Sequence, residues 1–289
     1  MTDAAARAAS HGAPVIAPAG WDAKKARLTE YFDRTASETW ARLTSDAPVS
    51  RVRATVRAGR DRMRATLLDW MGADLSGLRV LDAGCGTGAL AVEAARRGAR
   101  VVAIDVAGSL VSVAAERAPA DVRERIDFRV GDMLSPDLGR FDHVVAMDSL
   151  IHYRAQAMAE AAARLAALAD RSALFTFCPR TPALTVMHAA GQLFPRSDRS
   201  PAIEPVSERR LRRLVEARLA SPSPRPSPAG GRGGDIPAVG ASLADGAQAS
   251  PLAPPLPLAG EGRGEGMRCL RTERVSAGFY ISQALEIAR

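Results

Sequence analysis

The chain has 289 residues, of which 47% are hydrophobic, so it can build a substantial core and wholesale disorder is excluded. Its net charge of +7 is compatible with an anionic partner, but nearly all of the positive charge is arginine, a bias that GC-rich coding also produces. Three cysteines without a C-x-x-C pair argue against a disulfide framework or a zinc site. No segment resembles a secretory signal or a transmembrane helix, so we expect a cytoplasmic protein.

The N-terminal part of the chain precedes the first strand expected for a core sheet. Residues 1–20 are rich in Ala, Gly and Pro and predict a disordered tail. Residues 21–72 have helical periodicity and predict an N-terminal helical lid or substrate arm, whose second helix begins near Ser50. Arginines recur on this helix at helical spacing and form a basic stripe, which is either a solvated face or a site for carboxylates or phosphates. They are Arg53, Arg57, Arg60 and Arg64.

The segment from Leu78 to Asp105 predicts a strand, a glycine loop, a helix and a second strand. The glycines of the loop favour a tight turn and close approach of the backbone to a ligand. Their G-x-G-x-G spacing is weak alone, but Asp82 precedes the loop and would attract an amino group or a sulfonium. Asp105 ends the second strand about twenty residues later, where a carboxylate can accept hydrogen bonds from ribose hydroxyls. These features together predict a nucleotide-like ligand at the loop.

The remaining core alternates helices and strands, so the sequence predicts an α/β fold with a Rossmann-like, seven-stranded, mostly parallel sheet and helices on both faces. We expect helices at 109–117, 155–169 and 207–219 and strands at 126–130, 141–147 and 173–178. The core would span 73–220 and be completed by the terminal strands of 267–289, the last of them antiparallel. Residues 221–266 repeat a Pro/Gly-rich motif and predict a disordered insert.

The glycine loop with its two flanking acids resembles the class I S-adenosylmethionine-dependent methyltransferases. Asp132 and Met133 follow the third strand at its carboxyl end, where they would accept the adenine amino group and pack on the ring. We therefore expect S-adenosylmethionine as the cofactor. The residues expected to bind it are Asp82, Gly84, Cys85, Gly86, Gly88, Asp105, Val106, Asp132, Met133 and Met147.

Five further segments make a more specific resemblance, to the magnesium-protoporphyrin IX O-methyltransferases of bacteriochlorophyll and chlorophyll biosynthesis. They are Tyr31-Phe32 with Trp40, and the runs 48–60, 148–153, 193–201 and 278–286. The resemblance implies methyl transfer from S-adenosylmethionine to one propionate carboxylate of a magnesium porphyrin, giving the monomethyl ester. The magnesium belongs to the substrate, so no protein-bound metal is expected.

The same resemblance suggests roles for residues outside the cofactor motifs. His152 follows the fourth strand and would either position the carboxylate by a hydrogen bond or meet the porphyrin magnesium axially. Tyr31 would orient the carboxylate or cofactor from the helical lid, unless it is a packing aromatic. Arg51, Arg53 and Arg57 are candidates for the second propionate.

Partners follow from the family in the same way. The porphyrin-binding subunit of magnesium chelatase is a candidate partner, and the apolar N-terminal helices are a candidate surface for peripheral contact with the photosynthetic membrane. The alternative activity is an RNA methyltransferase that uses the basic N-terminal helix, although we expect no nucleic acid. A third alternative is a non-enzymatic cofactor-binding module. Strongly salt-dependent binding would indicate RNA.

Overall fold

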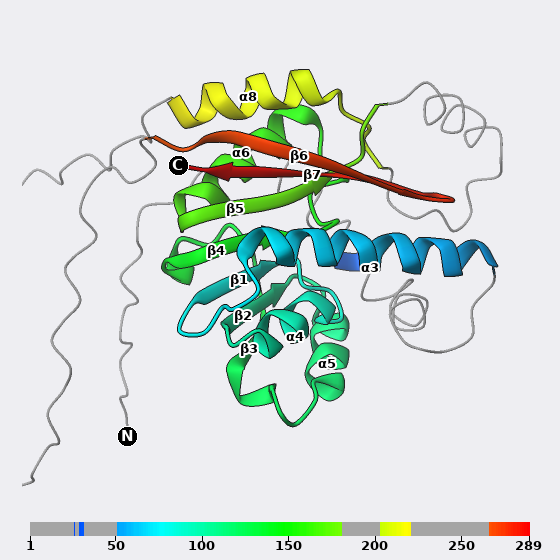
Figure 1. Cartoon of the computed structure of the whole chain (residues 1–289), viewed down its shortest axis with the longest axis vertical. Coiled ribbons are helices and arrows are strands. Elements are labelled where there is room, and N and C mark those ends of the chain that lie inside the picture. The colour runs from blue at the N-terminus through cyan, green and yellow to red at the C-terminus, as the bar shows by residue number, and fades with distance from the viewer. Residues whose placement is uncertain (1–25, 27–28, 32–50, 181–202, 221–265) are drawn as a thin grey trace, which may run out of the picture. The chain divides into compact units, whose positions relative to one another are not determined.

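The computed structural model describes residues 26, 29–31, 51–180, 203–220 and 266–289, except for the side chain of Pro136. Its elements alternate helix and strand along the chain, as the sequence predicted (Figure 1). In order they are α3 (Arg51–Met71), β1 (Arg79–Ala83), α4 (Ala89–Arg96), β2 (Arg100–Asp105), α5 (Gly108–Arg117), η2 (Arg123–Arg125), β3 (Ile126–Val130), η3 (Pro136–Leu138), β4 (Phe141–Ala146), α6 (Ala155–Ala167), β5 (Ala169–Phe177), α8 (Glu208–Ala220), β6 (Arg268–Ala277) and β7 (Tyr280–Ala288).

The strands form one seven-stranded sheet in the order β3-β2-β1-β4-β5-β7-β6. Strands β1 to β5 pair in parallel, whereas β7 is antiparallel to both β5 and β6. The order reverses between β1 and β4, so the carboxyl ends of these two strands border a crevice of the kind in which open α/β sheets bind ligands. The predicted fold class and the antiparallel last strand are confirmed.

Helices cover both faces of the sheet. Neighbouring residues of a central strand point to opposite faces, so both are buried under helices. Leu81 and Val144 pack with α6 and α8, whereas Val80 and Val145 pack with α3 and α4. The strands at the centre are therefore apolar on both faces, which explains their continuous hydrophobic runs in the sequence.

Two neighbouring boundaries were predicted incorrectly. The alanine-rich helix α6 ends at Ala167, and β5 begins at Ala169 rather than at Ala173. Arg140 stabilises this abrupt change because its guanidinium donates to the carbonyl oxygen of Ala167 at 2.8 Å and to the Asp170 carboxylate at 2.6 Å. Alanine content alone does not reveal a helix end that is capped by a side chain from another segment.

Several predicted segments lie outside the described residues. They are the N-terminal tail, most of the first helical segment, the run 193–201 and the insert, so the predictions made for them are untested. Within the ranges that are described, none of the helices combines the length and the apolar composition that crossing a bilayer requires.

Candidate functional site

The loop that joins β1 to α4 makes the predicted tight turn. Gly84, Gly86 and Gly88 have φ values of +79°, +54° and +77°, in the left-handed region. A Cβ on Gly84 would lie 2.4 Å from Cβ of Ser149, and one on Gly88 would lie 3.0 Å from Cβ of Ala114. A Cβ on Gly86 would meet no atom within 4 Å. Gly86 therefore leaves its backbone open to a ligand, whereas the other two glycines make room for neighbouring segments.

Asp105, at the end of β2, holds the glycine loop in place. One carboxylate oxygen accepts a hydrogen bond from Gly86 N at 2.9 Å, and the other accepts from Ala107 N at 2.9 Å. The carbonyl oxygen of Ile104, next to it, accepts from Gly84 N at 2.8 Å and from Cys85 N at 3.0 Å. The end of β2 thus fixes both the shape of the loop and the position of a carboxylate beside it.

Asp82, near the end of β1, is 2% exposed and accepts a hydrogen bond from Ala91 N, in the first turn of α4, at 3.1 Å. Burial raises the pKa of its carboxyl from 3.8 to about 7, against the lowering effect of the Ala91 hydrogen bond. The nearby Asp105 carboxylate raises this pKa further, and Arg64 lowers it. A buried carboxylate of this kind is well placed to receive a cationic group.

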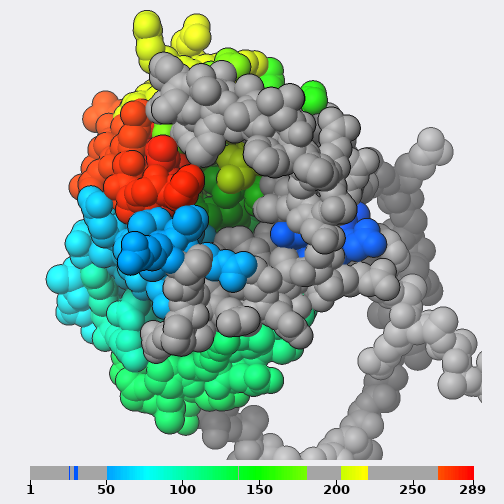
Figure 2. Space-filling model, turned by 90° about the vertical axis from the view of Figure 1, so that its right-hand side faces the viewer, coloured from blue at the N-terminus to red at the C-terminus, as the bar shows by residue number. Residues whose placement is uncertain are grey.

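A cavity of about 550 Å³ opens above this loop, within the size range of small-molecule sites. Figure 2 shows a hollow bordered by the start of α3 (blue) and by the hairpin of β6 and β7 (red). Every residue that the sequence predicted to bind the cofactor is among those that line the cavity, except Gly88. Asp132 follows β3 there, and its carboxylate accepts from Leu134 N at 2.9 Å.

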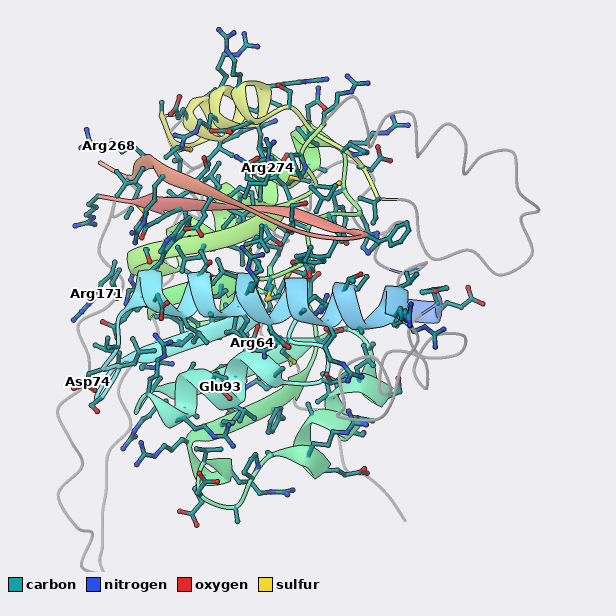
Figure 3. The ribbon with its side chains drawn as sticks, turned by 45° about the vertical axis from the view of Figure 1, so that its right-hand side comes forward. Arg64, Asp74, Glu93, Arg171, Arg268 and Arg274 are labelled. Atoms are coloured by element: carbon teal, nitrogen blue, oxygen red, sulfur yellow. The ribbon has the colours of Figure 1, made fainter. Side chains whose placement is uncertain are left out.

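Acidic and basic side chains both line this cavity. Asp82, Asp105 and Asp132 lie at the carboxyl ends of three neighbouring strands. On the other side, α3 presents three of the arginines of the predicted stripe, namely Arg57, Arg60 and Arg64, the last of which is labelled in Figure 3. Asp61, also on α3, pairs with Arg64 at 2.7 Å and reduces the positive charge on that side. The cavity can therefore hold a cation and an anion side by side.

Asp148, the second residue after β4, is the centre of a hydrogen-bond cluster that we name the Asp148 cluster. Its carboxylate accepts from Arg60 Nη1 at 2.6 Å, from the Tyr280 hydroxyl at 3.2 Å and from the Ser282 hydroxyl at 3.4 Å. Thr176 also donates its hydroxyl to this carboxylate, at 3.0 Å. Burial raises the pKa of Tyr280, so its phenol remains a donor at neutral pH.

The structure separates the remaining predicted residues into two groups. His152 is 6% exposed and lines the cavity, and Arg57 lines it from α3. Arg51 and Arg53 are exposed in the first turn of α3, and Tyr31 is half-buried. These last three are not among the described residues that line the cavity.

Two family models match the chain. A general methyltransferase domain matches residues 80–170, and the model of the magnesium-protoporphyrin IX methyltransferase C-terminus matches residues 146–225. The magnesium-protoporphyrin O-methyltransferase of Rhodobacter capsulatus is 50% identical over 188 residues, which is 65% of this chain and 84% of that protein. This chain belongs to the magnesium-protoporphyrin O-methyltransferase family. The family member from Synechocystis is 31% identical over 66% of this chain and 84% of its own.

A solved structure of this family supports the same assignment. The magnesium protoporphyrin IX methyltransferase of Synechocystis with bound S-adenosylhomocysteine superimposes with a TM-score of 0.68 at 26% identity, covering 92% of this chain and 99% of that one. The cavity described above has features that suit S-adenosylmethionine, which is S-adenosylhomocysteine with the transferable methyl group. Gly86 leaves open space beside the loop, and carboxylates flank it where cationic and hydroxyl groups need acceptors.

No group of three or more His, Cys, Asp or Glu side chains that could hold a metal ion occurs within the described ranges.

Sequence reasoning missed the Asp148 cluster as a unit. Asp148 stood only within the family segment 148–153, and Arg60 only within the basic stripe and the family segment 48–60. A usable signal did exist, because Asp148 lies at the carboxyl end of a parallel strand, as do Asp105 and Asp132. Its pairing with Arg60 could not be predicted, because the two residues are 88 positions apart.

Proposed function

We propose that this chain transfers the methyl group of S-adenosylmethionine to a propionate carboxylate of magnesium-protoporphyrin IX and releases the monomethyl ester. This is a step of chlorophyll and bacteriochlorophyll biosynthesis. The observation that carries the proposal is the charge distribution of the cavity, in a chain of this family: carboxylates on the strand side suit the cationic cofactor, and the arginines of α3 suit an anionic substrate.

The chemistry requires little acid–base assistance from the protein. A propionic acid titrates near pH 4.3, like a Glu side chain, so the nucleophile is already ionised at neutral pH. S-adenosylmethionine supplies a methyl group made electrophilic by the sulfonium. The side chains of the cavity then have to align the carboxylate in line with that group and exclude water from two charges that cancel in the transition state.

On the cofactor side, we assign Asp82 to the amino group or sulfonium and Asp105 to the ribose hydroxyls. Asp132 would accept from the adenine amino group, while Met133 packs on the ring. Gly84, Cys85 and Gly86 would supply the backbone of the loop, with Gly88 supporting it through its contact with Ala114. Val106 and Met147 complete the apolar lining.

On the substrate side, His152 is assigned to position the reacting carboxylate by a hydrogen bond, with axial contact to the porphyrin magnesium as the alternative. Tyr31 is assigned to orient the carboxylate or cofactor from the N-terminal lid. Of the arginines proposed for the second propionate, Arg57 has the strongest support because it lines the cavity, whereas Arg51 and Arg53 are exposed.

The organisation of the chain and its surroundings are part of the same proposal. Residues 21–72 would form the substrate arm, 73–220 with 267–289 the catalytic core, and 221–266 a dispensable insert. The porphyrin-binding subunit of magnesium chelatase is the proposed source of substrate, and the site of action is the cytoplasm with peripheral contact to the photosynthetic membrane. The relatives reported above lend no support to the alternative substrate, RNA.

The decisive experiment is a methyl-transfer assay with labelled S-adenosylmethionine, magnesium-protoporphyrin IX and purified full-length protein. We expect a labelled monomethyl ester, and a strong loss of turnover in His152→Ala with cofactor affinity preserved in calorimetry. Arg62→Gln is a suitable control because Arg62 is exposed and contacts only the Ser276 carbonyl, at 3.4 Å, in the described hydrogen bonds. A wild-type protein that binds the cofactor but forms no ester would refute the proposal.

A further inference from the structure

Phe279 lies at the tip of the hairpin formed by β6 and β7. Ala277 of β6 pairs with Tyr280 of β7, so Gly278 and Phe279 form a two-residue turn. Gly278 has a φ of +57°, a conformation that such turns need at their first position and that glycine adopts without strain. Turn positions favour small or polar residues, so the geometry of the turn does not explain a phenylalanine there.

The backbone of this turn is fixed on both sides of Phe279. A Cβ on Gly278 would lie 2.6 Å from Oγ1 of Thr55, so the turn packs closely on α3. Tyr280 is 9% exposed and donates its hydroxyl to the Asp148 carboxylate at 3.2 Å. Figure 1 shows the tip of the hairpin at the same end of the molecule as the start of α3. The position of Phe279 is therefore well defined, although its side chain is exposed.

Phe279 lines the cavity and is still 61% exposed, which places it at the mouth. Single exposed apolar side chains are common on protein surfaces and by themselves indicate no ligand. Two further apolar residues line this cavity without being buried: Ile203, which is 42% exposed, and Val56 on α3, which is half-buried. The cavity therefore presents accessible apolar side chains from three separate segments of the chain.

The volume of the cavity implies that a ligand extends into its mouth. The cavity measures about 550 Å³, and sites of about 300–1,000 Å³ typically hold one drug-sized molecule. The proposed reaction needs two ligands at once, the cofactor beside the glycine loop and a tetrapyrrole. The macrocycle is the flat, apolar part of that substrate, and its faces leave water only where apolar side chains cover them. We therefore expect part of the macrocycle to lie at the mouth.

We propose that the Phe279 ring packs against a face of the porphyrin macrocycle at the mouth of the cavity. This inference rests on the proposed function and adds to it a residue that contacts the substrate. An aromatic side chain on a fixed turn loses little conformational entropy on binding, and it stacks favourably on another flat π-system. The contact involves the macrocycle alone, so the propionates remain with the residues assigned to them above.

A lipid surface is the other occupant that an exposed phenylalanine could have. A segment that lies in a membrane interface needs an apolar face made of several side chains. Leu270, the other exposed large hydrophobic residue of this hairpin, precedes Ala277 by seven residues, or about 23 Å along β6. The two exposed hydrophobic residues of the hairpin therefore do not form one apolar face, and the place of Phe279 on the cavity favours the porphyrin.

The test compares two porphyrins that share a macrocycle and differ in their carboxylates. Binding of the magnesium porphyrin diacid and of its dimethyl ester, which has no free carboxylate, is measured by porphyrin fluorescence in one mild detergent. The full-length protein is used with S-adenosylhomocysteine present, so that no methyl group is transferred. In Phe279→Ala we expect the Kd to rise at least about fivefold for both porphyrins, because an aromatic contact with the macrocycle is lost in both cases.

Three further variants make the result specific. Phe279→Trp keeps an aromatic ring, so its Kd should stay within about twofold of the wild type. Phe279→Leu keeps apolar area without the ring and should lie between the wild type and Phe279→Ala, and it carries the test if the alanine variant does not fold. Leu270→Ala is the matched control, since Leu270 is 40% exposed on the same hairpin and is not among the residues that line the cavity. Cofactor affinity in calorimetry should match the wild type in all four.

The outcomes separate this inference from the proposed function. Weaker binding of both porphyrins in Phe279→Ala, with Leu270→Ala unchanged, supports the inference. An unchanged Kd for the dimethyl ester, an equal loss in Leu270→Ala, or a wild type that binds the diacid but not the dimethyl ester would overturn it.

A membrane role for Phe279 would give a different result. Phe279→Ala would then keep its porphyrin affinity but no longer sediment with phosphatidylglycerol vesicles, which also overturns the inference. The ester assay tests the proposed function independently. Ester formation by a wild type whose porphyrin affinity does not depend on Phe279 refutes the inference alone, whereas porphyrin binding through Phe279 without ester formation refutes the proposed function alone.

Discussion

Gly59 of α3 lies against the ring of Tyr280 on β7, so closely that a Cβ built on Gly59 would be 2.4 Å from Cδ1 of the ring. One turn earlier, Thr55 stands in the same relation to Gly278, whose Cβ would be 2.6 Å from the Thr55 Oγ1. These two contacts seat the helix that carries the cavity arginines on the terminal hairpin. The position of Arg60 therefore depends on strands that are more than 200 residues away in the sequence.

Gly59→Ala is expected to destabilise the protein. In an exposed helix, this change stabilises by about 0.5–1 kcal/mol, because glycine loses more backbone entropy on folding. Here the added methyl group would collide with the Tyr280 ring, and overpacking of this kind costs about 1–3 kcal/mol. We expect the clash to dominate, with a lower urea midpoint. Ala58→Ser, at the exposed neighbouring position, should change the free energy of unfolding by no more than about 0.5 kcal/mol. A Gly59→Ala protein at least as stable as the wild type would contradict the packing described.

Cofactor affinity is expected to rise with pH between 5.5 and 7, if Asp82 receives the amino group of the cofactor. In the protein without cofactor, burial raises the pKa of Asp82 to about 7. The carboxylate that the cofactor needs is therefore a minor species at pH 5.5. The amino group of the cofactor stays charged over this range, since α-amino groups titrate near 7.7–8.0. We expect the Kd to fall by about tenfold over this interval in calorimetry.

Asp82→Asn should bind the cofactor weakly and with a nearly flat pH profile. The thiol of the nearby Cys85 cannot produce this pH dependence, because burial raises its pKa and keeps it protonated. The carboxylate of Asp105 raises the pKa of Asp82 and Arg64 lowers it, so Arg64→Gln should move the midpoint of the profile to higher pH. A steep profile that persists in Asp82→Asn would exclude Asp82 as its source.

Much of the fold was predictable from the sequence because its signals are local. The runs around Val80 and Val102 are apolar since both faces of the central strands are covered, and Gly98 lies two residues after the end of α4, with a φ of +98°. The cofactor half of the site was predictable for the same reason, as its acidic residues lie at or near the carboxyl ends of strands. The Asp148 cluster was not, because Arg60, Asp148 and Tyr280 meet only after the sheet has assembled.

Two glycines of the loop, Gly84 and Gly86, should respond differently to an added methyl group. Gly86→Ala adds a Cβ in open space, so we expect a folded protein with modest destabilisation, about 1–2 kcal/mol, from the left-handed backbone. Because this space belongs to the cavity, we also expect the cofactor Kd to rise at least tenfold. Gly84→Ala instead collides with Ser149, whose hydroxyl donates to the Ala83 carbonyl at 3.0 Å, and should lose more stability. Equal cofactor affinity in Gly86→Ala and the wild type would rule out the loop as a cofactor contact.

His143 is expected to make the protein less stable in mild acid. It is 5% exposed, its Nδ1 lies 2.8 Å from the Ser172 hydroxyl, and its Nε2 has no hydrogen-bond partner among the described residues. Burial lowers its pKa from 6.5, and Arg171 lowers it further, against the effect of Asp142. Below pH 6.5 the unfolded chain therefore binds a proton that the folded protein does not, and stability falls as the pH falls.

His143→Gln should remove this acid dependence, measured as the free energy of unfolding between pH 7 and 5. Asp82 has the opposite effect on stability, because its pKa is raised in the folded protein. The stability that it contributes is complete below pH 3.8 and is lost as the pH rises to about 7. The difference between the wild type and His143→Gln isolates the histidine, since both contain Asp82. Parallel stability curves for the two proteins would refute the effect.

Replacement of residues 222–265 by eight Gly and Ser residues is expected to leave folding and methyl transfer intact. The flanking elements already contact each other, through the Glu208 carboxylate with the Thr272 hydroxyl at 3.0 Å and through Arg212 with the Cys269 carbonyl at 3.2 Å. The end of α8 lies eight residues beyond Arg212, about 12 Å along the helix, and eight extended residues span about 26 Å. The Tm should change by no more than a few degrees, and kcat/KM by no more than about threefold. A protein that no longer folds would show that the segment has a structural role, and one that folds without activity would show that it contributes to the site.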